Sequence, residues 1–210
     1  MPSRPTEPDY EASPFAAAAR PPSALIVGPI RRFTRREYDA LVVSDFFEDE
    51  KLELLDGLIF EKPAEGPSHS KPILRLNMLL APALLGRADV GVQLPFAASD
   101  FSEPEPDLFI VPRDDDNEDH PSRAFCVIEV AVTSQRRDRM KVRIYAENGV
   151  PQLILIDVPR REARIYREPR DGDYGRVETL REGERVVIDA FPDVAFDLKD
   201  VLPRVVPNPG

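Results

Sequence analysis

Two carboxylates lie within apolar segments that otherwise have the composition of buried strands. Asp107 directly precedes the run Leu-Phe-Ile-Val at 108–111, and Glu129 interrupts the run at 125–132. Short continuous runs rich in branched residues are typical of strands buried on both faces. An ionised carboxylate there is costly unless a cation or hydrogen bonds accept it. Lys141 follows on a predicted helix, and two carboxylates with a lysine indicate a divalent-metal phosphodiesterase site.

Length and composition favour one globular domain with a sizeable core. The chain has 210 residues, of which 42% are hydrophobic and 31% charged, as in ordinary soluble domains. No apolar stretch approaches the roughly 20 residues needed to cross a bilayer, and the N-terminus lacks a signal-peptide layout. The single cysteine, Cys126, falls in a core run and cannot form an intramolecular disulfide. We therefore expect a cytoplasmic protein without membrane contact.

The net charge of −10 counts against indiscriminate nucleic-acid binding, which usually needs a basic surface. It does not exclude a nuclease. A basic groove can coexist with an acidic remainder, and metal ions neutralise carboxylates at a site.

The N-terminal part contains local signals for where order begins. Residues 1–28 are rich in proline without apolar periodicity, so we expect a disordered leader there. Thr34 and Glu37 match a capping box, which predicts a helix to about Val43. Asp56-Gly57 predicts the turn of a hairpin over 52–60. We expect one domain over 29–203, followed by a tail at 204–210.

The remaining elements predict a mixed architecture. Residues 68–72 start a helix with Pro72 in its first turn; Pro82 kinks it or ends it early, and Gly86 stops it. Predicted strands lie near 89–97, 105–111, 124–132 and 153–158, with a helix at 136–148. Segments 162–167, 175–180 and 184–190 alternate like an antiparallel meander. This order indicates an α/β (α+β) domain around a mixed sheet flanked by helices.

Each candidate site residue can also be explained without a functional role. Asp107 and Glu129 would suit Mg²⁺ or Mn²⁺ as hard oxygen ligands, or they lie solvated at strand ends or pair with arginine. Lys141 would position water or offset phosphate charge, or it belongs to a solvated helix face. Glu53 is a third carboxylate or a surface acid of the hairpin. His69, just before a helix, could bind metal or phosphate, or serve only as a capping residue.

Other kinds of site lack support. The acidic segment at 114–119 has neither the glycine nor the terminal glutamate of a Ca²⁺ loop, so we interpret it as solvated. The chain has no phosphate-binding Gly-rich loop, no Gly-x-Ser-x-Gly elbow and no paired cysteines.

The ordered set of short motifs resembles the Uma-two family within the PD-(D/E)XK, restriction-endonuclease-like superfamily. The matching elements run in one order over about residues 30–203: the hairpin Glu53-Leu54-Leu55-Asp56-Gly57, His69, Pro106-Asp107-Leu108, Glu129-Val130, Asp138-Arg139-Met140-Lys141, Tyr145 and Gly149-Val150-Pro151. Departures include the missing proline after Glu129-Val130, in 131–135, and Gln152-Leu153-Ile154 in place of an aromatic pattern.

The resemblance implies a restriction-endonuclease-like core with an N-terminal hairpin and C-terminal antiparallel strands. It implies a metal held by Asp107 and Glu129, with Glu53 completing the acidic cluster. The usual lysine of the E-x-K element is replaced here by Ala131, so Lys141 would supply the ammonium from the following helix. His69 is a further candidate.

Three hypotheses follow. The preferred one is a Mg²⁺- or Mn²⁺-dependent endonuclease acting on DNA, and a homodimer is expected because related proteins often work as dimers. The second is a catalytically silent binding or assembly module, which the acidic charge and the lysine missing at 131 favour. The third is a metal-dependent hydrolase of another phosphoester.

Overall fold

The computed structural model describes residues 29–44, 46–47, 50–62, 65–113, 119–132 and 135–204. The chain divides into two units, Met1–Arg31 and Arg32–Gly210, and every helix and strand below lies in the second. The expected leader at 1–28, nearly all of the acidic segment at 114–119 and nearly all of the tail at 204–210 lie outside the described residues. The predicted domain limits therefore stay a prediction.

The first two elements follow local signals in the sequence. Helix α1 (Arg35–Val43) begins with the predicted capping box: Thr34 Oγ1 accepts a hydrogen bond from the Glu37 amide, and the Glu37 carboxylate accepts one from the Thr34 amide. Strands β1 (Leu52–Leu55) and β2 (Leu58–Glu61) form the predicted antiparallel hairpin. Asp56 and Gly57 take φ of 53° and 76° at its turn, as expected for Asp-Gly.

Helix α2 (Pro67–Leu84) starts earlier than predicted. It starts at Pro67, because the amides of His69 and Ser70 already bond to the Gly66 carbonyl. Pro72 therefore lies inside the helix rather than in its first turn, and that part of the prediction is wrong. The helix continues to Leu84, past Pro82, and Gly86 follows with φ of 75°. The earlier start places His69 in the first turn of α2.

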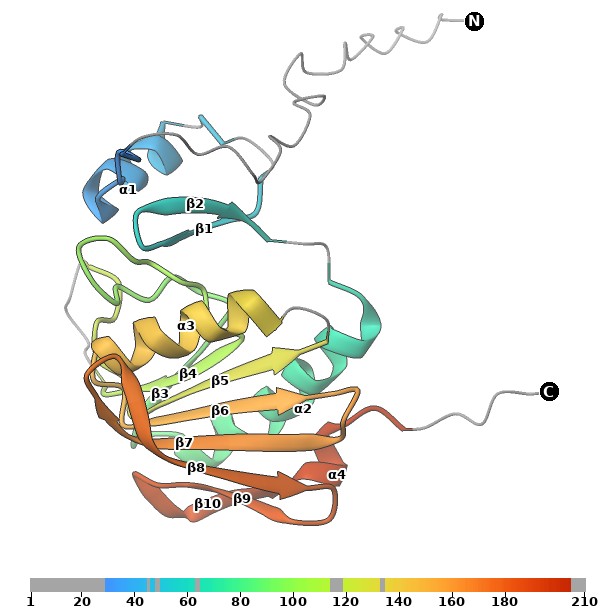
Figure 1. Cartoon of the computed structure of the whole chain (residues 1–210). Helices are drawn as coiled ribbons and strands as arrows, with labels where there is room; N and C mark the ends of the chain where they lie inside the picture. The colour runs from blue at the N-terminus through green and yellow to red at the C-terminus, as the bar shows by residue number, and fades with distance from the viewer. Residues whose placement is uncertain are drawn as a thin grey trace, which may run out of the picture. The chain divides into compact units, whose positions relative to one another are not determined.

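A six-stranded mixed sheet forms the centre of the fold (Figure 1). Its order is β3 (Asp89–Val92), β4 (Leu108–Val111), β5 (Cys126–Ala131), β6 (Gln152–Asp157), β7 (Glu162–Arg170) and β8 (Asp173–Arg181). Only β5 and β6 pair in parallel, and helix α3 (Gln135–Glu147) connects them. The predicted α+β fold with a central mixed sheet and flanking helices is confirmed.

Two apolar clusters cover the two faces of this sheet. On one face, α2 packs Leu76 and Leu80 against Ile128 and Val130 of β5. On the other face, the cluster includes Ile144 and Tyr145 of α3 and neighbours such as Val127. Because successive strand residues point to opposite faces, Glu129 lies on the α3 side. Strand alternation thus directs one carboxylate toward the helix that carries Lys141.

The C-terminal region differs from a simple meander. Strands β7 and β8 extend the sheet as predicted, but β9 (Arg185–Ile188) pairs with β10 (Phe191–Asp197) in a separate two-stranded sheet. The reason is burial: Val186, Val194 and Phe196 pack into the cluster on the α2 side. Helix α4 (Leu198–Val201), which was not predicted, follows and joins the same cluster. None of the described helices is long and apolar enough to cross a membrane.

We expect Leu76→Ala to lower the free energy of unfolding by about 2–5 kcal/mol, because Leu76 is fully buried under the sheet and its truncation leaves a cavity. Leu74→Ala is the matched control on the same helix, since Leu74 is 60% exposed. Urea denaturation of both variants measures the difference. Equal losses would contradict this packing of α2.

Candidate active site

Asp107 lies buried at the start of β4, held by the neighbouring strand and by α2. Its Oδ2 accepts a 2.7 Å hydrogen bond from the Val130 amide of β5. The same oxygen lies 3.2 Å from Nε2 of His69. The β4–β5 pairing, which sets Leu108 opposite Ile128, brings this carboxylate beside β5. Asp107 is thus fixed from two sides by elements distant in sequence.

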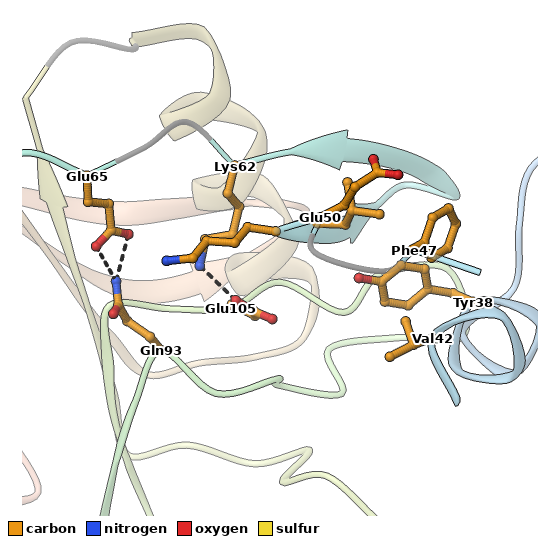
Figure 2. Close-up of a pocket in the computed structure, with 10 residues that line it drawn as sticks. Tyr38, Val42, Phe47, Glu50, Lys62, Glu65, Gln93 and Glu105 are labelled. Carbon is orange, nitrogen blue, oxygen red and sulfur yellow. Dashed lines mark hydrogen bonds and ion pairs between the residues drawn. The ribbon is translucent and has the colours of Figure 1, made fainter. Parts of the chain in front are cut away.

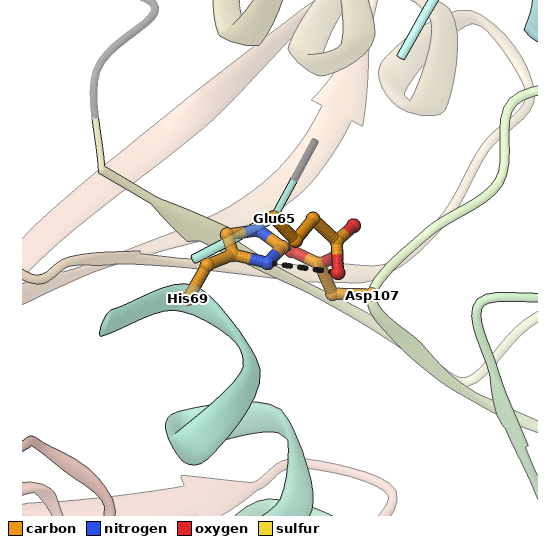
Figure 3. A group of neighbouring side chains, drawn as sticks. All are labelled: Glu65, His69 and Asp107. Carbon is orange, nitrogen blue, oxygen red and sulfur yellow. Dashed lines mark ion pairs between the residues drawn. The ribbon is translucent and has the colours of Figure 1, made fainter. Parts of the chain in front are cut away.

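His69 links Asp107 to a carboxylate that the sequence analysis did not single out. Its Nδ1 lies 3.3 Å from Oε2 of Glu65, yet this buried nitrogen makes no hydrogen bond of good geometry. Burial lowers the pKa of His69, but the hydrogen bond and charge of Asp107 and the charge of Glu65 outweigh it, so the pKa is raised. Figure 3 shows the imidazole beside the two carboxylates.

Glu65 is positioned by a polar contact from across the site. The amide nitrogen of Gln93 lies 2.7 Å from both oxygens of its carboxylate. The ligand atoms of Glu65, His69 and Asp107 all lie within 4.8 Å of one another. Glu65 lies four residues before His69 but outside α2, ahead of the N-cap Gly66. The sequence analysis missed it because helical spacing does not apply to a residue that precedes the helix.

Lys141 forms a second cluster with the other two predicted acids. Its Nζ lies 2.8 Å from Oε1 of Glu129 and 3.2 Å from Oε2 of Glu53, and it donates a 3.4 Å hydrogen bond to the Glu105 carbonyl. Glu53 is almost fully buried because β1 alternation turns it, with Leu55, away from Leu52 and Leu54.

The electrostatics of this second cluster follow from one ammonium facing several carboxylates. Burial raises the pKa of Glu129 to about 7, although Lys141 opposes the shift. Burial lowers the pKa of Lys141, but the charges of Glu129, Glu53 and Asp107 outweigh it and raise that pKa. Lys141 is therefore a fixed cation at neutral pH rather than a proton acceptor.

Tyr145, one turn after Lys141 on α3, fixes the orientation of Glu129. Its hydroxyl donates a 2.6 Å hydrogen bond to Oε1 of Glu129. Burial and the adjacent Glu129 carboxylate raise the pKa of Tyr145 well above its ordinary value, so the phenol keeps its proton. The sequence analysis quoted this tyrosine within a motif but gave it no role.

The structure thus brings all five predicted residues to one region but divides them into two groups. Asp107 and His69 join Glu65, whereas Glu129 and Glu53 share Lys141. The first group fits a divalent cation: it offers two carboxylates and an imidazole whose buried Nδ1 has no hydrogen-bond partner. The second group fits a role in holding charge near that cation.

Comparisons with known proteins concern the family and the fold of this chain. The family model described as "Uma2: Putative restriction endonuclease" matches residues 35–199. The chain is also similar to the crystal structure of a putative nuclease belonging to DUF820 from Anabaena variabilis ATCC 29413, at 18% sequence identity and a TM-score of 0.62. That similarity covers 76% of this chain and 96% of the other, and at this identity it concerns the fold. The comparison with curated proteins gave no match.

We expect Lys141→Met to destabilise the fold in a pH-dependent way. At about pH 8 the loss should reach about 3–5 kcal/mol, because two buried carboxylates lose their cation. The pKa of Glu129 in the folded protein already exceeds its ordinary 4.5, and removing the ammonium raises it further. The folded state then binds the proton more tightly than the unfolded state, so the loss should shrink as the pH falls to about 5.

Chemical denaturation at both pH values measures this effect. Lys199→Met is the matched control, since Lys199 is 56% exposed and pairs with a half-buried Asp197. Its loss should stay within about 0.5 kcal/mol at either pH. A pH-independent loss in Lys141→Met would contradict the assigned electrostatics.

Proposed function

The chain belongs to the Uma2 family, whose members are described as putative restriction endonucleases, and we propose that it is a metal-dependent endonuclease hydrolysing DNA phosphodiester bonds. One observation carries the proposal. The ligand atoms of the partly buried Glu65 and His69 and of the buried Asp107 converge within 4.8 Å, beside a lysine that two further carboxylates hold. Carboxylates that lie this close together repel one another, and a bound divalent cation would stabilise their charged forms.

Glu65, His69 and Asp107 would hold the ion, with Mg²⁺ and Mn²⁺ as candidates. The imidazole nitrogen favours Mn²⁺ over Mg²⁺, which prefers oxygen ligands. When bound, such an ion would activate water and neutralise charge on the scissile phosphate. The ligand set predicted from the sequence, Asp107 with Glu129 and Glu53, is the alternative. Glu129 and Glu53 contact Lys141, which favours a role in holding this ammonium rather than in binding the metal.

The chain's own residues supply the remaining functions. Lys141, protonated at neutral pH, would steady negative charge on the phosphate or orient water. Glu129 and Glu53 keep its ammonium in place, and Tyr145 keeps Glu129 in place. The absence of a lysine at position 131 therefore does not leave the site without a cation. A homodimer, which we also propose, would present two such sites to one DNA molecule.

We expect Asp107→Asn to lower metal-dependent DNA cleavage by about 100-fold or more, because a charged ligand is lost while the shape of the side chain is kept. The measurement is cleavage of supercoiled and linear DNA with Mg²⁺, with Mn²⁺ or with EDTA. Asp193→Asn, at a 66% exposed side chain on β10, should cut like the parent. Parent-like cutting by Asp107→Asn would overturn the role of this residue. Without any cutting by folded parent protein, the binding or assembly module becomes the better function.

Metal titration distinguishes the two ligand sets. We expect Glu65→Gln and His69→Ala each to weaken Mn²⁺ binding by at least about tenfold, measured by calorimetry. Glu129→Gln should leave it close to the parent value. His120→Ala is the matched histidine control, because His120 is exposed. Weakening by Glu129→Gln together with parent-like binding by Glu65→Gln would restore the ligand set predicted from the sequence.

A further inference from the structure

A pocket of about 480 Å³ opens beside the proposed metal site. Figure 2 shows its two ends: an apolar end with Tyr38, Val42 and Phe47, and a polar end with Lys62 and Gln93. The volume lies in the range of about 300–1,000 Å³ that is usual for small-ligand sites. It suits one nucleotide and is too small to admit a duplex.

Two glutamates connect this pocket to the site. Glu65 lines the pocket and also belongs to the proposed metal ligands. Glu105 lines it too, while its backbone carbonyl accepts a hydrogen bond from Lys141 and its amide donates one to Glu53. A phosphate held at the metal and Lys141 would therefore have the adjoining nucleotide at the mouth of the pocket.

The apolar end offers a surface on which a base can stack. The rings of Tyr38 and Phe47 pack with centroids 6.3 Å apart and an interplanar angle of 37°. Tyr38 is buried by this packing, yet both rings line the pocket. Stacking on aromatic side chains is a general way to bind unpaired bases without sequence preference.

The polar end suits an uncharged base better than a phosphate. Lys62 lies 2.8 Å from Glu105, so its charge is already paired. With Lys51, Glu50 and Glu65 also in the lining, carboxylates outnumber lysines, and the pocket lacks the positive charge that a phosphate needs. The Gln93 amide group donates to Glu65. In the described part of the chain no donor reaches the side-chain carbonyl oxygen of Gln93. This oxygen could accept a hydrogen bond from the amino group of a base.

We propose that this pocket receives a single unpaired DNA base, extruded from a duplex or in a single strand, next to the phosphate that is cut. The inference rests on the proposed nuclease function and names its substrate class: DNA with an unpaired nucleotide. An enzyme that needs a base outside the helix gains selectivity where the base is already unpaired, because unstacking then costs least.

Binding in EDTA tests the pocket without cleavage. The probe is a DNA hairpin with one bulged 2-aminopurine, compared with the fully paired hairpin and with one that carries an abasic residue at the bulge. We expect the protein to bind the hairpin with the bulged base about tenfold or more tightly than either control, because stacking of one base contributes a free energy of that size. The fluorescence of the bulged 2-aminopurine should be quenched by Phe47 and Tyr38. Equal affinity for the abasic bulge would overturn the proposal. Tighter binding of the equivalent RNA hairpin would reassign the substrate to RNA and overturn it for DNA.

Variants at two neighbouring valines test whether the base binds in this pocket. Val42 lines the pocket at 48% exposure, whereas Val43 is 83% exposed and does not line it. Val42→Glu and Val43→Glu change the net charge equally, so long-range repulsion affects both alike. We expect Val42→Glu alone to abolish the preference for the bulged base. Both variants alter exposed helix positions, and equal thermal melting would verify the fold. Parent-like preference in Val42→Glu would place the base elsewhere and refute the proposal.

The failures of the two proposals are distinguishable. If Mn²⁺-dependent cutting occurs at equal rates on paired and bulged DNA, the nuclease stands and the pocket assignment fails. If the bulged base binds in the pocket but no metal supports cutting, the pocket assignment stands and the nuclease fails.

Discussion

The ammonium of Lys141 lies between the carboxylates of Glu129 and Glu53, and the arrangement of the site depends on this contact. It connects helix α3, the sheet and the N-terminal hairpin through groups that are all largely buried. Buried charges are tolerated only in such mutual arrangements, since each alone would lose its hydration without compensation. Glu129 and Glu53 thus face the ammonium, whereas Asp107 contacts His69.

This division gives the two groups different chemical properties. One group contains an imidazole and two carboxylates with an unsatisfied buried nitrogen, which are properties of a metal site. The other contains a permanent cation and a glutamate fixed by Tyr145. Under the proposed function, the two groups would together serve as the acid and lysine elements of a restriction-endonuclease-like site. Here the lysine comes from the helix rather than from the strand.

An acidic chain can still act on DNA when the positive charge is local. Lys141 and a bound cation would provide that charge at the cut phosphate, and the adjoining pocket would contribute stacking rather than Coulomb attraction. A protein of this kind is expected to bind paired DNA weakly, because backbone affinity depends on many phosphate contacts with basic side chains. Selectivity for an unpaired base would then replace a broad basic surface.

Local signals in the sequence determined the capping box at Thr34, the turn at Asp56-Gly57, the strands around Asp107 and Glu129, and the family. They also identified Asp107 and Glu129, because a charge in an apolar strand is unusual by itself, and the family resemblance added Lys141, Glu53 and His69. The tertiary structure decided which carboxylate meets which partner. The segment ahead of α2 brought Glu65 to His69, and the β4–β5 register brought Asp107 beside β5. The packing of α3 against β5 and the hairpin gave Lys141 its two acids. Such pairings depend on distances of a few ångströms between distant segments, which local patterns do not encode.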